Sequence, residues 1–171
     1  MDINNLLLIA LRLIHIMSAV AWFGMAMVMF AFLIPAERLA GESGLRFMKA
    51  IFTGTRLPRA FGPVAGTATL AGILLFIFGD VRVHFSDTAI IILGIGAAAG
   101  ILAAGHGGTA TGRYTAAYAE ALTKNLVDNQ SPTAEGSAAI EAAREKFVLH
   151  VRISFFLVLI SLVFMASARY F

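Results

Sequence analysis

The chain has 171 residues, of which 59% are hydrophobic and 13% charged, and its net charge is +3. Soluble domains carry roughly a quarter charged residues, so this composition indicates a protein whose solvent is partly lipid. The chain has no cysteine, which excludes disulfides, thiolate metal sites and thiol catalysis. Its basic residues flank apolar segments instead of forming a basic patch, which argues against a nucleic-acid partner.

Four stretches of the chain reach the roughly 20 apolar residues that a helix needs to cross the hydrocarbon core of a bilayer. They are residues 6–33, 60–78, 88–110 and 147–168. Backbone polar groups cannot stay unpaired in lipid, and the stretches lack the strict alternation of barrel strands, so helices are predicted. We therefore expect an all-α polytopic membrane protein, with residues 1–171 forming one antiparallel four-helix transmembrane bundle.

Most of the Lys and Arg residues lie in two long connections, residues 34–59 and 111–146. Cytoplasmic loops of membrane proteins are enriched in these residues. Both connections are therefore expected to be cytoplasmic, which places both termini on the outer, periplasmic side of a bacterial-type inner membrane.

Each connection also contains a helical signal. In the first, Leu45, Met48 and Phe52 recur at helical spacing among basic residues, which predicts a short amphipathic helix lying on the inner leaflet. In the second, we expect the third stretch to continue to a turn at residues 128–130. Ser131 and Pro132 are then predicted to begin a helix that runs into the fourth stretch.

Small residues indicate where the helices approach one another. Gly62 with Gly66, and Gly96 with Gly100, have the four-residue spacing that lets two helix backbones pack closely in a membrane. The third stretch is so rich in Gly and Ala that it is expected to be a tightly packed inner helix, or one that lies against a flat cofactor.

Three histidines fall inside the apolar stretches, where ionisable residues are costly and often functional. At 1.5 Å per residue, His106 and His150 are expected at similar depth near the cytoplasmic side, with His15 nearer the outer side. Each belongs to a stripe on one helix face that should point inward, and His106 is expected to share its face with Arg113. His84, in the short second connection, is expected to be solvated.

Imidazoles inside a four-helix bundle suggest haem b, because neutral histidine is a common axial ligand of haem iron. We expect His106 and His150 to hold the iron, with His15 replacing one of them if the helices tilt. Three arginines near the cytoplasmic ends could pair with the haem propionates: Arg59, Arg113 and Arg152. The expected function is electron transfer or a porphyrin- or quinone-linked oxidoreduction.

Two alternatives remain open. The histidines can instead be polar contacts between helices, in a non-catalytic subunit of a larger membrane complex or a homo-oligomer. Met25 and Met29 share a helix face, and thioethers favour Cu(I), so a copper-handling protein is the third interpretation. Methionine is also common packing material in helix cores.

Two segments resemble the HemJ/CopD group of small membrane proteins, which includes HemJ-type protoporphyrinogen oxidases and CopD copper-resistance proteins. The first is Leu11-Arg12-Leu13-Ile14-His15 followed by Trp22-Phe23-Gly24, and the second is His106-Gly107-Gly108 followed by Gly112-Arg113-Tyr114. The resemblance implies that His15 and His106 match the haem-linked histidines of those enzymes. The lysine early in their third helix and the start of their fourth helix are absent here, so the resemblance implies a haem-binding relative with altered function.

Overall fold

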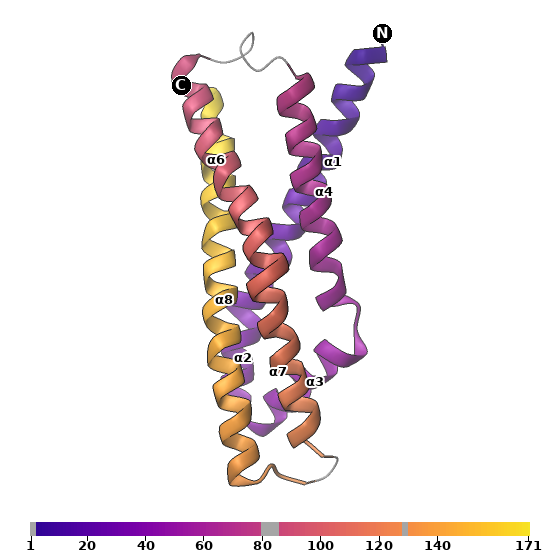
Figure 1. Ribbon diagram of the computed structural model, residues 1–171, viewed down its shortest axis with the longest axis vertical. Helices are drawn as coiled ribbons and strands as arrows, with labels where there is room; N and C mark the ends of the chain where they lie inside the picture. Colours follow the sequence, from indigo (N-terminus) through magenta and orange to yellow (C-terminus); the bar gives the residue numbers. More distant parts are fainter. Residues whose placement is uncertain (1–2, 80–85, 128–129) are drawn as a thin grey trace.

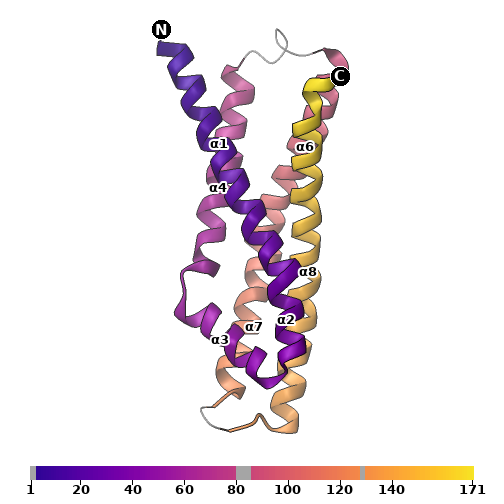
Figure 2. The same cartoon turned by 180° about the vertical axis from the view of Figure 1, so that it is seen from behind.

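Four antiparallel helical rods make up the molecule (Figures 1 and 2). The computed structural model describes residues 3–79, 86–127 and 130–171. The first rod comprises α1 (Ile3–Val28), a π-helical turn η1 (Met29–Leu33) and α2 (Ile34–Ala40), and the short helix α3 (Glu42–Gly54) follows it. The second rod is α4 (Leu57–Phe78); the third comprises α6 (Asp87–His106), the π-helical turn η2 (Gly107–Thr111) and α7 (Gly112–Asn125). The fourth is α8 (Ala134–Ser167), which ends in a 3-10 turn η3 (Ala168–Tyr170).

Both chain ends lie at one end of the bundle, here called the terminal end, and α3 lies at the opposite, connection end (Figure 1). All four rods are long and apolar enough to cross a membrane. The predicted helices are thus confirmed, but the rods are longer than the predicted spans. The first rod runs from Ile3 to Ala40, 38 residues, or about 57 Å of helix against about 30 Å of hydrocarbon. Residues 34–40, 112–125 and 134–146, predicted as parts of connections, are therefore helical extensions of the rods.

The rods associate as two pairs. α1 packs most extensively against α4, and α6 against α8. A Cβ on Gly96 would come within 2.8 Å of the Met165 side chain, and one on Gly100 within 2.9 Å of the Ser161 hydroxyl, so these glycines let α6 approach α8. The predicted close approach is confirmed for this pair of glycines and wrong for Gly62 and Gly66, because a Cβ on either would meet no described atom within 4 Å.

The two pairs meet in a central layer to which each rod contributes one buried residue: Trp22, Ala68, Ala103 and Val158. On the outward faces, by contrast, large apolar side chains remain exposed, Leu13, Phe76, Ile91 and Leu102 among them. Exposed apolar surface on this scale is unusual for a protein surrounded by water, and it is what lipid-facing helices present.

A second core fills the connection end. Met48 of α3 is fully buried there with Tyr118 and Leu122 of α7 and Ile140 and Phe147 of α8. The amphipathic helix predicted around Met48 is therefore confirmed, but its predicted place on the inner leaflet is wrong. Its apolar face packs on α7 and α8, since the extended rods offer an apolar surface where the prediction had only loops.

The start of the fourth rod also differs from the prediction. Thr133, and not Ser131, caps α8, and its side-chain oxygen accepts a hydrogen bond from the Gly136 amide at 3.1 Å. The Ser131 hydroxyl instead donates to Glu42, at the start of α3, at 2.8 Å. The predicted continuation of the third stretch is confirmed as far as Asn125. The predicted turn includes Asp128 and Asn129, which lie outside the described residues.

Replacing Phe147 by Ala should destabilise the connection end strongly. The Phe147 ring stacks on Tyr118 and meets Phe52 edge-on, with centroids 5.2 and 5.5 Å away. Truncating such a ring costs about 3–5 kcal/mol of unfolding free energy, which unfolding of the purified protein in mixed micelles would measure. Phe156 on the same helix is 46% exposed, so Phe156→Ala is the matched control, and equal losses for the two variants would contradict this description of the core.

Candidate functional site

His106 of α6 and His150 of α8 meet inside the bundle. The Nε2 atom of His106 lies 3.0 Å from Nδ1 of His150, and the ring centroids are 5.1 Å apart. The prediction that the two rings reach the same depth is thereby confirmed. One nitrogen of this hydrogen bond donates and the other accepts, so the accepting imidazole is neutral.

Two hydroxyls and one aromatic ring complete this group. The Ser154 hydroxyl lies 2.9 Å from Nδ1 of His106, and the Thr111 hydroxyl lies 2.8 Å from that of Ser154. The Tyr114 ring stacks almost parallel on His150, with centroids 4.3 Å apart. We call these five residues the two-histidine cluster. Ser154 belongs to the inward stripe predicted for His150, whereas Thr111 and Tyr114 were not predicted.

The π-helical turn η2 explains why Thr111 and Tyr114 join the cluster. The Gly112 amide bonds to the Gly107 carbonyl five residues earlier, and such a turn shifts the helix face by about one residue. The face that holds His106 therefore continues to Thr111 and Tyr114. The predicted common face of His106 and Arg113 is wrong, because Arg113 is exposed, its guanidinium 5.8 Å from the centre of the Tyr114 ring.

His15 has a different environment, between α1 and α4. Its Nδ1 atom lies 2.8 Å from the Ala68 carbonyl oxygen. A carbonyl only accepts, so Nδ1 carries the proton and Nε2 keeps a lone pair. A Cβ on Gly72 would lie 2.8 Å from the Cε1 atom of His15, so the ring needs a glycine at this position.

The central layer separates His15 from the two-histidine cluster. His15 precedes Trp22 by seven residues, about 10 Å along α1 toward the terminal end. His106 and His150 lie on the other side, because they are nearer the connection end than Ala103 and Val158 of that layer. The structure thus brings two of the three predicted ligands together and keeps the third apart.

The residues differ in how they suit haem. Two axial ligands hold the iron and the plane of the macrocycle between their nitrogens, so the bond between His106 and His150 would have to open to admit haem there. His15 needs no such change. A histidine whose second ring nitrogen donates to a backbone carbonyl is the usual arrangement of a metal-ligating imidazole, and Nε2 of His15 is left to ligate.

The three arginines predicted to bind propionates are all exposed: Arg59, Arg113 and Arg152. Arg59 lies in the first turn of α4, and Arg152 lies on the surface of α8 beside α2. Within the described ranges none of the three forms an ion pair or lies in hydrogen-bond contact with a histidine.

The sequence analysis missed a buried polar group at the connection end. Glu37 of α2 is only 2% exposed, and the Tyr118 hydroxyl donates a hydrogen bond to its Oε1 atom. The Nε atom of Arg144 lies 3.5 Å from the same oxygen, and its Nη1 lies 2.7 Å from Glu141. A signal was present, because Tyr114, Tyr118 and Leu122 recur every four residues through the supposed connection.

Across residues 3–79, 86–127 and 130–171, no three His, Cys, Asp or Glu side chains converge to hold a metal ion. Met29 packs in the core of the connection end, as methionines commonly do. Fold and site together define a class, a helical bundle with four membrane-length rods and a two-histidine cluster inside. No family model, curated protein or solved structure matches the chain, so the resemblance to the HemJ/CopD group stays a prediction.

Proposed function

We propose that the chain is an integral protein of a bacterial-type inner membrane, with both termini on the periplasmic side. Four membrane-length rods and exposed apolar side chains support insertion. Arg38, Arg46, Arg56, Lys124 and Lys146 all belong to the connection end, which supports a cytoplasmic position for that end.

Single cysteines test this orientation, because the chain has none of its own. Arg169→Cys and Lys124→Cys place a thiol at exposed positions near opposite ends of the bundle. With a membrane-impermeant maleimide on intact spheroplasts, Arg169→Cys should be labelled at once and Lys124→Cys only after permeabilisation. The reverse pattern, or equal labelling of both, would contradict the proposed orientation.

Haem b is the proposed cofactor, with His15 as an axial ligand. The observation that carries this step is the bond from Nδ1 of His15 to the Ala68 carbonyl, which orients the ring and leaves Nε2 as the ligating atom. When bound, haem supplies an iron that takes up and releases one electron. The resemblance of the first helix to HemJ-type proteins favours the same residue.

The two-histidine cluster is the proposed site of proton exchange with a quinone or a porphyrin. A proton can pass along the bond between Nε2 of His106 and Nδ1 of His150, and the Ser154 and Thr111 hydroxyls extend the chain of donors and acceptors. These groups hydrogen-bond a carbonyl or a pyrrole nitrogen equally well. The proposed activity is therefore electron transfer or a quinone- or porphyrin-linked oxidoreduction.

An absorption spectrum tests the cofactor directly. Protein purified in a mild detergent from haem-replete cells should be red, with a Soret band that shifts when dithionite is added. A colourless preparation with intact helical structure would contradict haem binding.

The alternative function is a non-catalytic subunit of a larger membrane complex. One observation favours it: both ring nitrogens of His106 already have partners within the chain, as expected of a polar contact between helices. Recovery from gentle detergent within a large assembly, without haem, would support this alternative. Metal analysis of protein purified without chelators tests the copper interpretation in the same material.

A further inference from the structure

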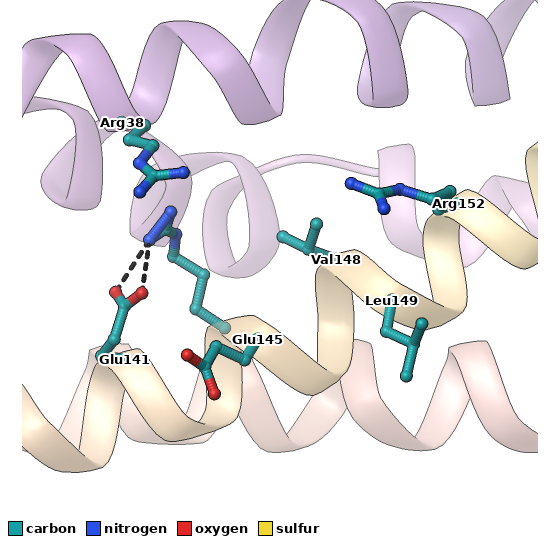
Figure 3. Close-up of a pocket in the computed structure, with 7 residues that line it drawn as sticks. Arg38, Glu141, Glu145, Val148, Leu149 and Arg152 are labelled. Atoms are coloured by element: carbon teal, nitrogen blue, oxygen red, sulfur yellow. Dashed lines mark hydrogen bonds and ion pairs between the residues drawn. The ribbon is translucent and has the colours of Figure 1, made fainter.

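A recess of about 250 Å³ lies between α2 and α8 near the connection end (Figure 3). Arg38 borders it from α2, and Arg152 and Val148 border it from α8. Figure 3 shows Arg38 and Arg152 extending toward the same space from the two facing helices, with Val148 between them. The recess therefore combines two cationic side chains with an apolar surface.

The remaining charges of the recess leave those two cations uncompensated. Arg144 also borders it, but its guanidinium is already bonded to Glu141 and close to Glu37. Glu145 borders it too, and Figure 3 shows that its carboxylate points away from Arg152. In the described part of the chain, Arg38 and Arg152 form no ion pair. Two guanidiniums that face one space without a carboxylate are suited to a shared anion.

The surface of α8 changes character at this recess. Before it, toward the connection end, the exposed residues include Glu141 and Glu145. Beyond it, Leu149, Ile153 and Phe156 are large, apolar and exposed. In a membrane this boundary falls at the level of the lipid headgroups, where basic pockets between helices bind anionic lipid.

We propose that the recess binds an anionic phospholipid of the cytoplasmic leaflet. Its phosphate lies between Arg38 and Arg152, and an acyl chain follows the apolar surface of α8 that begins at Val148 and Leu149. The inference rests on the proposed membrane insertion and orientation and is independent of haem.

Native mass spectrometry of the purified protein, titrated with phosphatidylglycerol or phosphatidylcholine, tests the proposal. The wild-type chain should retain phosphatidylglycerol in preference to phosphatidylcholine. Arg38→Gln and Arg152→Gln should each weaken phosphatidylglycerol binding about fivefold, the effect of one basic residue at a membrane surface. Arg59→Gln, an exposed arginine at the same end but outside the recess, is the control and should leave binding unchanged.

Further arms separate the remaining outcomes. Arg38→Lys and Arg152→Lys should retain most of the binding if charge is what matters. Inorganic phosphate at millimolar concentration should not displace the lipid, and displacement would identify free phosphate as the ligand and overturn the proposal. Equal weakening by Arg59→Gln, or no weakening by the double glutamine variant, would also overturn it. Cysteine labelling reports insertion separately, so failure of the lipid site and failure of the membrane assignment are distinguishable.

Discussion

The His15→Ala variant is expected to lose haem, with Soret absorbance per mole of protein falling about tenfold or more. The substitution removes the Nε2 ligand and leaves the Ala68 carbonyl without its donor. The four rods should still form, because the side chain is only partly buried and the core lies elsewhere. Absorption spectra and circular dichroism of the purified protein measure the two effects separately.

The other two histidines supply the matched comparison. His106→Ala and His150→Ala remove the same side chain from the two-histidine cluster, and they should keep the Soret band while slowing quinone or porphyrin turnover. If they abolish the band and His15→Ala preserves it, the pair ligates the iron and its hydrogen bond opens to do so. Gly72→Ala adds a graded test, since its Cβ would press on the His15 ring and should shift the band.

The Gly44→Ala variant is expected to lose about 3 kcal/mol of unfolding free energy, at the upper end of the usual cost of overpacking. Gly44 lies in the first turns of α3, and a Cβ there would come within 2.7 Å of the Glu37 Cα. The clash is with backbone, which cannot rotate aside as a side chain can. The turn between α2 and α3 would have to open, which strains the buried bond between Glu37 and Tyr118.

Gly54→Ala provides the control for this substitution. It makes the same change in the same helix, at its last residue, where a Cβ would meet no described atom within 4 Å. Its stability should remain within about 1 kcal/mol of the wild type. Unfolding in mixed micelles and limited proteolysis between α2 and α3 measure both variants, and a similar loss in both would show that the close approach at Gly44 is unimportant.

Hydropathy and helical spacing were sufficient to predict the four helices and the meeting of His106 with His150. Both are consequences of periodicity and antiparallel direction. The same method ended the first and third helices too early, because it measures apolar length and the rods continue with one apolar side only. Glu37 was assigned to a connection for this reason, although it belongs to a buried face that includes Tyr118.

The two π-helical turns could not be predicted from spacing. Each changes the phase of the rod that contains it, so residues beyond Thr111 face directions that a regular helix would not give them. Sequence hints exist in hindsight. Gly107 and Gly108 have little preference for a regular helix, and Pro35 follows the other turn and has no amide hydrogen to donate. Neither hint specifies which way the following face will turn.

The pairing of the rods has a consequence for how the protein is made. Each tightly packed pair, α1 with α4 and α6 with α8, consists of rods that are consecutive in the chain. Each pair is therefore a helical hairpin that can assemble once its second rod has emerged from the ribosome, and the N-terminal hairpin forms first. The central layer and the packing of α3 on α7 and α8 join the two hairpins only afterwards. Biogenesis thus divides into two local events and one docking event.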